Sequence, residues 1–177
     1  MSAFRTYSQI EINPVEPKLE DITIVDIAHA LPLLCRGGGH LKTFFSVGLH
    51  SINCAKEAKA RNYSRKVQLG CLLHDASEAY LADITRPVKQ FLPQYLEIEK
   101  RLQTLIWDKY LGEALTDEEY KQVFLVDDCM LYYEFIYFMD KEVLDYKPPL
   151  NSDPVFEFLD FATVEAEFMA LFNELIG

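Results

Sequence analysis

Apolar residues recur along most of the chain at the three- or four-residue spacing that amphipathic helices require. Ile24, Ile27 and Leu31 show this spacing clearly, and no segment alternates apolar and polar residues as a half-buried strand would. The segments predicted to be helical are residues 21–36, 44–61, 64–81, 92–111, 116–139 and 152–176, the last holding one or two helices. The pattern predicts one all-α domain over residues 1–177, a bundle of about six or seven helices.

Polar residues at the starts of these segments can cap the helices. The candidate N-caps are Asp21 or Thr23, Thr43 or Ser46, Ser64 and Thr116, in chain order. Thr116 is followed three residues later by Glu119, which predicts a capping box. Residues 1–20 are predicted to be irregular, and three consecutive glycines in residues 36–40 predict a break. We expect the long apolar helix 116–139 to lie at the centre of the bundle.

Composition narrows the class of protein. The net charge of −11 disfavours extended nucleic acid as a partner, although a small anionic substrate could still meet a few convergent basic residues. The N-terminus lacks the order of a signal peptide, and no apolar run is long enough to cross a bilayer. We therefore expect a soluble cytoplasmic protein with no membrane partner. Its C-terminal segment 141–177 is expected to pack on the core rather than to form a subunit contact.

The four cysteines do not have the spacing of a zinc site. None forms a CxxC pair, and Cys54, Cys71 and Cys129 lie in apolar helical contexts. They are predicted to be buried, reduced thiols.

The segment CLLHDASEAYLADITRPVK, residues 71–89, places ionisable residues within an apolar pattern. Glu78 follows His74 by four residues and Asp75 by three, so a helix would bring all three side chains to one side. A bound cation would relieve their mutual repulsion and desolvation. The alternative is a helix edge at the surface with three solvated side chains.

Other ionisable residues lie in equally apolar helices. His50 stands in FFSVGLHSINCA, where the alternative is a core histidine bonded to a backbone carbonyl. Asp127 and Asp128 stand in VFLVDDCMLYY, where the alternative is a helix break or an exposed ridge. The presence of two histidines and two acids in apolar helices is accounted for if all four bind a single metal ion. Mixed nitrogen and oxygen ligands suit a borderline or hard divalent metal.

The order of these residues resembles a known signature. His50, then His74-Asp75, then a distant Asp127 is similar to the H…HD…D pattern of the HD-domain metal-dependent phosphohydrolases. The resemblance extends over residues 20–140, through DIAHALPLLCRGGGHLKTFFSVGLHS, LLHDASEAYLADITRPVK and VDDCMLYYE. It is strongest in the 5′-deoxynucleotidase-like branch. The implied fold is a single HD-type helical domain whose core, residues 20–140, carries the metal site.

The resemblance implies a site and a reaction. The ligands of one divalent ion (Co, Mn, Zn, Fe or Mg) would be His50, His74, Asp75 and Asp127. Asp127 is preferred to Asp128 because it stands seven residues before Glu134, as in the family's closing motif. Metal-bound water would remove the 5′-phosphate of a small nucleotide. Glu78 would assist that water or protonate the leaving sugar oxygen, or else orient His74 or a water.

The resemblance also implies how the substrate is held. Arg36 would grip the phosphate bidentately, Asp83 would lie near the sugar, and His40 and Lys89 would border the site. An alternative for Asp83 is an N-cap of the following turn. Family members carry a bulky aromatic residue beside the arginine, where this chain has Gly37.

Several alternatives remain open at this point. The substrate could be another phosphorylated metabolite or a signalling nucleotide, and a non-catalytic nucleotide-binding module is the alternative from a different class. Homodimers are common in the family, so a homodimer is one expected assembly.

Overall fold

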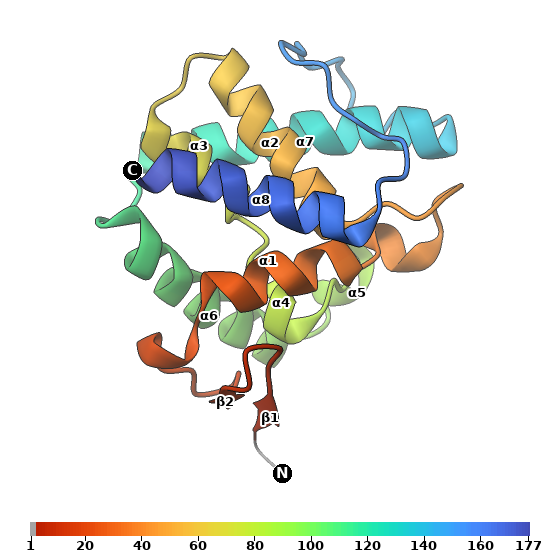
Figure 1. Ribbon diagram of the computed structural model, residues 1–177. Coiled ribbons are helices and arrows are strands. Elements are labelled where there is room, and N and C mark those ends of the chain that lie inside the picture. The colour runs from red at the N-terminus through yellow and green to blue at the C-terminus, as the bar shows by residue number, and fades with distance from the viewer. Residues whose placement is uncertain (1–2) are drawn as a thin grey trace.

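A computed structural model describes residues 3–177. Its elements, drawn in Figure 1, are β1 (Phe4–Arg5), β2 (Glu11–Ile12), a 3-10 turn η1 (Leu19–Asp21), α1 (Ile24–Leu33), a second 3-10 turn η2 (Arg36–Gly39), α2 (Val47–Ala60), α3 (Arg65–Leu72), α4 (Glu78–Leu81), α5 (Arg86–Lys89), α6 (Pro93–Leu111), α7 (Asp117–Met139) and α8 (Phe161–Ile176). The prediction of a single all-α bundle is confirmed. The described residues hold eight α-helices rather than six or seven, because two of them, α4 and α5, are single turns.

The helices begin where polar residues can cap them. The side chains of Thr23, Ser46 and Ser64 each accept a backbone N–H from the first turn of the following helix. Thr116 and Glu119 form the predicted capping box at the start of α7. The boundaries of four helices therefore follow from local sequence.

Helix α2 forms the centre of the bundle. Eleven of its 14 residues are buried, and it packs against α1, α3, α7 and α8. It approaches α1 closely at Gly48, where a Cβ atom would lie 2.9 Å from the backbone nitrogen of Pro32. A side chain at this position would force the two helices apart.

The prediction that segment 116–139 lies at the centre is wrong. One face of α7 packs inward through Val123, Val126 and Met130, whereas Phe124 and Leu125 on the other face are 44% and 49% exposed. The apolar residues of α7 surround the helix, but only one face meets α2 and α3. Apolar content alone could not place this helix in the core.

The predicted helix 64–81 is interrupted. Helix α3 ends at Leu72, and α4 begins only at Glu78. Gln103 on α6 stabilises the break, because its Nε2 donates to the carbonyl of Leu73 at 2.7 Å and its Oε1 accepts from the Ser77 N–H at 3.1 Å. These side-chain bonds satisfy backbone groups that a continuous helix would have paired internally.

The N-terminal segment was expected to be irregular, but it contains a short antiparallel hairpin in which Phe4 pairs with Ile12. The hairpin is tied to α1, because Asp26 accepts bonds from both N–H and Oγ of Ser8 at 2.7 Å. Helix α8 packs on the core through Val164 and Phe168, which confirms the expectation for the C-terminal segment.

The irregular segment between α7 and α8 is anchored on α2. Fully buried Glu57 accepts hydrogen bonds from the backbone of Asn151 and Ser152, from the Ser152 hydroxyl and from Arg61. Burial alone would raise the pKa of Glu57, but these bonds outweigh it and hold the pKa below its ordinary value. The carboxylate thus replaces the partners that this stretch of backbone lacks.

Within residues 3–177, no helix combines the length and the apolar character that a membrane span needs.

Candidate metal centre

Four side chains predicted to bind a metal converge on one point. His50 comes from α2, His74 and Asp75 from the turn after α3, and Asp127 from α7. Nε2 of His50 lies 3.1 Å from Nε2 of His74 and 3.2 Å from Oδ1 of Asp127. Nε2 of His74 lies 3.3 Å from Oδ2 of Asp75 and 3.6 Å from Oδ1 of Asp127. With metal–ligand bonds of about 2.1 Å, adjacent ligands of an octahedral ion lie about 3.0 Å apart.

The partners of the two imidazoles show which ring nitrogens carry hydrogen. Nδ1 of His50 contacts Glu134, and Nδ1 of His74 contacts the carbonyl oxygen of Cys71 at 2.7 Å. Both partners accept hydrogen bonds, so each Nδ1 is a donor. In the neutral rings, both Nε2 lone pairs then face each other across 3.1 Å. This arrangement is repulsive unless positive charge lies between them, and it is the hydrogen-bonding pattern of metal-bound histidines.

The centre attracts positive charge strongly. Burial by itself lowers the pKa of His74, but Asp75 and Asp127 raise it well above its ordinary value. The same carboxylates would favour a metal ion, which would compete with the proton for the site.

Cys54 also faces this centre. It is fully buried one turn after His50, with its sulfur 3.5 Å from Nε2 of His50. Ligand atoms of His50, Cys54 and His74 lie within 4.8 Å of one another, so this group could bind a metal ion. Burial raises the pKa of the Cys54 thiol well above its ordinary value, which favours the protonated form over a thiolate ligand. The prediction that Cys54 is a buried free thiol is confirmed, but a place among the possible metal ligands was not predicted for it.

Arg36 and Glu134 form a second layer of charge. Glu134 accepts from His50 through Oε1 and from Nε of Arg36 through Oε2 at 3.1 Å, while Nη1 of Arg36 lies 3.2 Å from Oδ2 of Asp75. Burial lowers the pKa of Arg36, but these carboxylates raise it above its ordinary value. Arg36 lines the cavity beside the centre, as expected. Two of its nitrogens already hold carboxylates, which leaves Nη2 and one hydrogen of Nη1 for the expected grip on a phosphate.

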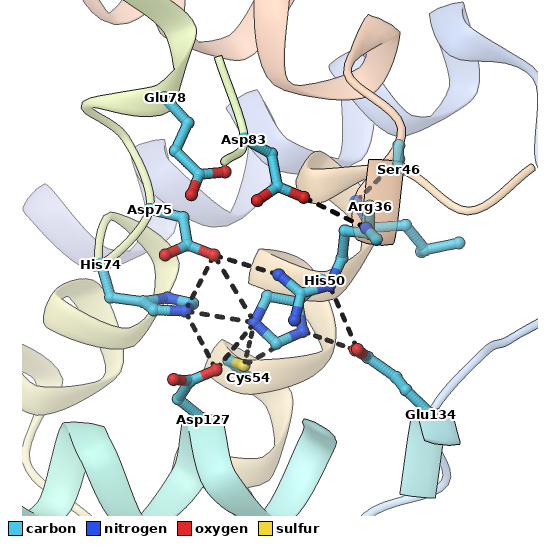
Figure 2. Close-up of polar contacts among 12 residues, drawn as sticks. Arg36, Ser46, His50, Cys54, His74, Asp75, Glu78, Asp83, Asp127 and Glu134 are labelled. Carbon is cyan, nitrogen blue, oxygen red and sulfur yellow. Dashed lines mark hydrogen bonds and ion pairs between the residues drawn. The ribbon is translucent and has the colours of Figure 1, made fainter. Parts of the chain in front are cut away.

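A first cavity of about 200 Å³ adjoins the centre. Its wall contains Glu78, which is only 5% exposed and whose Oε2 is buried without a hydrogen-bond partner within residues 3–177. Burial, together with the charges of Asp75 and Asp83, raises the pKa of Glu78 well above its ordinary value. This shift favours the protonated form of the Glu78 carboxyl group. Figure 2 shows Glu78 and Asp83 together on one side of the ligand group.

The glycine turn and Asp83 are linked directly. The N–H of Gly37 donates to Oδ2 of Asp83 at 3.2 Å, and Gly37 has φ +61°, a conformation that glycine adopts at least cost. Asp83 lines the first cavity, whereas the N-cap of α5 is Thr85. The alternative role for Asp83 as an N-cap is therefore wrong.

Of the two remaining residues predicted to border the site, Lys89 lies at the site and His40 does not. Lys89 lines the first cavity, with Nζ 3.6 Å from Oε1 of Glu78 and 2.6 Å from Oε1 of Glu99. His40 is exposed and lines neither of the cavities described here, so the structure does not bring it to the site. Its neighbouring glycines turn the chain away, with η2 ending at Gly39.

Arg86, which the sequence offers beside Lys89 either as a partner for the charge of the substrate or as a balance to the acidic surface, also reaches the centre. Its Nη2 donates to Oδ2 of Asp127 at 3.0 Å, and its Nη1 to Oδ1 of Asp128 at 3.4 Å. Asp127 therefore turns Oδ1 to the histidines and Oδ2 to Arg86. The only signal in the sequence was the basic pair flanking Pro87.

A second cavity, of about 690 Å³, adjoins the same centre and extends between α6 and α7. Both cavities are lined by Asp75, Arg86, Lys89 and Asp127. The candidate centre therefore stands at the junction of two compartments.

Comparison with known proteins gives two relatives. No family model matches the chain. It is 36% identical over 110 residues to the uncharacterized protein YfdR of Escherichia coli, a match that covers 62% of this chain and 59% of that protein. It is 33% identical over 108 residues to the uncharacterized protein RCAP_rcc00048 of Rhodobacter capsulatus, covering 58% and 55%. The chain thus matches less than two thirds of the length of either relative, and neither name states an activity.

Proposed function

We propose that the protein is a divalent-metal-dependent phosphohydrolase of the HD-domain type that removes the 5′-phosphate of a small nucleotide. The observation that carries this proposal is the convergence of two histidine Nε2 atoms and two carboxylate oxygens from three segments. The two carboxylates, of Asp75 and Asp127, line a cavity whose wall also contains Glu78, a buried residue with one oxygen that has no hydrogen-bond partner among residues 3–177.

The donor set fits a metal ion. His50 and His74 offer neutral nitrogens whose rings are oriented by Glu134 and by a backbone carbonyl, and Asp75 and Asp127 offer oxygens. A divalent ion held by these four residues would acidify a water and polarise a phosphate ester. Mixed nitrogen and oxygen donors suit Mn, Fe, Co or Zn better than Ca.

Glu78 supports a hydrolytic role over a purely binding one. A carboxyl group that keeps its proton at neutral pH can donate it to the leaving sugar oxygen as the bond to phosphorus breaks. Oε2 of Glu78 has no hydrogen-bond partner among the described residues, so it is free to make this contact. A non-catalytic nucleotide-binding module would have no need of such a group.

Basic side chains around the first cavity suit a phosphorylated substrate. Arg86 is exposed and uses only Nη1 and Nη2, so its remaining donors can reach a phosphate oxygen. Lys89 adds a second positive charge on the same wall. Arg36 and Arg86 each pair with two carboxylates and each keeps further N–H donors, so we assign the phosphate contact to both.

Phosphate release tests the proposal. Metal-stripped protein, reloaded in turn with Mn²⁺, Co²⁺, Zn²⁺ or Mg²⁺, should release phosphate from at least one deoxy- or ribonucleoside 5′-monophosphate. Asp75→Asn should abolish both metal retention and release. Absence of release from every nucleotide with every metal, or full activity in Asp75→Asn, would contradict the proposal.

A further inference from the structure

The second cavity shares two α5 residues with the first cavity but is not lined by Glu78. Arg86 and Lys89 line both compartments, but Glu78 and Asp83 line only the first. A phosphate at the candidate centre would therefore face the first cavity with one oxygen and the second cavity with another. Ligand pockets for small molecules commonly measure about 300–1,000 Å³, a range that the second cavity reaches and the first does not.

Aromatic side chains line the far part of the second cavity. Trp107 packs edge-on against Tyr120 at a centroid distance of 5.7 Å, and Tyr120 lies 4.7 Å from Phe124. Tyr120 and Phe124 are both 44% exposed, although each is large and apolar. Such a cluster offers ring faces and edges to a further planar group.

The polar groups of this cavity are mostly committed to the protein. Gln103 bonds the turn after α3, and Thr104 donates to the carbonyl of Lys100 on its own helix. Nζ of Lys89 is held by Glu99. Nε1 of Trp107, by contrast, is buried without a partner among the described residues. Exposed Lys100 and Asp117 also line this cavity and form no side-chain hydrogen bond or ion pair among the described residues. The aromatic part of the wall suits a planar ring.

We propose that the second cavity binds an aromatic group attached to the far side of the phosphate, so that the same centre also hydrolyses a phosphodiester. The inference rests on the proposed function for its phosphate position and extends it to a second substrate class. The sugar leaving group would lie in the first cavity beside Glu78 and Asp83. The aromatic group would lie against Tyr120 and Phe124.

The reaction balances as a simple hydrolysis. The oxygen of one water bonds to phosphorus, and the bond between phosphorus and the sugar oxygen breaks. The leaving oxygen keeps the electron pair and takes the proton of Glu78, which is restored from the attacking water. The products are a free nucleoside and an aryl phosphate monoester, which remains in the second cavity until it dissociates.

The chain carries a direct reporter for this cavity, because Trp107 is its only tryptophan. We would titrate the Zn²⁺-loaded Glu78→Gln variant, in which turnover is slow, with the phenyl ester of thymidine 5′-phosphate. The methyl ester is the matched probe, since it has the same charge and nucleoside but no second ring. The phenyl ester should change Trp107 emission saturably and bind about tenfold more tightly, whereas the methyl ester should leave emission unchanged.

Two substitutions on α7 distinguish the effect of losing a ring that lines the cavity from the effect of losing an apolar side chain beside it. Phe124→Ala removes a ring that lines the cavity and should abolish most of the preference for the phenyl ester. Leu125→Ala is the matched control, because Leu125 is the adjacent exposed apolar residue and does not line either cavity described here. Both positions are about half exposed, so both variants should fold, and thermal unfolding checks this.

The outcomes distinguish this inference from the proposed function. Equal affinity for the two esters with unchanged Trp107 emission, or no binding of the phenyl ester, would overturn the inference even if nucleoside monophosphates are hydrolysed. A saturable Trp107 response to the phenyl ester that depends on Phe124 would support the binding site even if no phosphate compound is hydrolysed. In that case the proposed function and the diesterase step would both fail, and only the aromatic site would stand.

Discussion

Nδ1 of His50 on α2 donates a hydrogen bond to Oε1 of Glu134 on α7. The bond turns Nε2 of His50 toward His74 and Asp127, so Glu134 decides which nitrogen of His50 is presented at the candidate centre. Glu134 is itself held by Arg36, which also contacts Asp75. The orientation of the centre thus depends on residues that would not touch the ion.

Replacing Glu134 should weaken metal binding without removing a ligand. We expect Glu134→Ala to lower the affinity for Zn²⁺ about 10–100-fold, because the imidazole loses its orienting partner. Glu134→Gln keeps a carbonyl acceptor and should show a smaller loss. Competition with a chromogenic chelator measures both affinities, and an unchanged affinity in Glu134→Ala would contradict the role assigned to this bond.

The neighbouring acids on α7 offer a matched pair of variants. Asp127→Asn should eliminate metal retention, because Oδ1 of Asp127 lies among the histidine nitrogens. Asp128→Asn should retain the metal, since Asp128 contacts only Arg86 among the ion pairs of the described residues. Metal content after gel filtration distinguishes the two acids, and the reverse result would move the centre by one residue.

Glu78→Gln should separate chemistry from metal binding. The amide has nearly the same shape as the protonated carboxyl group but cannot transfer its proton, so we expect kcat to fall about 10²–10⁴-fold with metal content unchanged. Steady-state kinetics and elemental analysis of the same preparation check the prediction. Loss of metal in this variant would place Glu78 among the ligands instead.

A substitution at Gly48 tests whether the close packing of α1 against α2 contributes to stability. Gly48→Ala would place a methyl group against the backbone of Pro32 and should lower the free energy of unfolding by about 1–3 kcal/mol. Gly70→Ala is the control, because its methyl group would meet side chains rather than backbone, those of Val123 at 3.2 Å and Leu115 at 3.6 Å, and alanine favours the helix. Urea unfolding compares the two, and equal losses would contradict the packing argument.

The buried Glu57 predicts a specific pH dependence of stability. The pKa of Glu57 in the folded protein lies below its ordinary value of 4.5, so its contribution is complete above that pH and is lost as the pH falls toward the folded-state pKa. Glu57→Gln should lower the free energy of unfolding at pH 7 by about 1–3 kcal/mol and flatten its decline in acid. Exposed Glu97→Gln is the control, and parallel curves for all three proteins would contradict the prediction.

Local sequence predicts much of this fold because the decisive interactions are short in range. The caps at Thr23, Ser46, Ser64 and Thr116 act within one turn, and the helical spacing of Ile27 and Leu31 identifies the buried face of α1. The break after Leu72 depends instead on Gln103, which lies thirty residues beyond Leu73 and on another helix. No pattern within residues 64–81 contains that information.

Some features of the candidate site could likewise be predicted from local sequence, whereas others depend on contacts between residues far apart in the chain. The four residues expected as ligands do lie together, because each was conspicuous as an ionisable residue in an apolar helix. The bonds of Arg36 to Glu134 and Asp75, and those of Arg86 to Asp127, join residues about 40–100 positions apart and depend on the packed fold. The prediction that His40 borders the site was wrong. Its neighbours in sequence lie at the site, but its own side chain does not.

The outward face of α7 has a consequence for concentrated solutions of the protein. Phe124 and Leu125 are each more than 40% exposed on a molecule whose net charge is −11. At low ionic strength, like-charge repulsion keeps such faces apart. At 1 M salt the screening length shrinks to about 3 Å, and the repulsion no longer reaches beyond a single side chain. Salt concentration should therefore control the colloidal behaviour of this protein through α7.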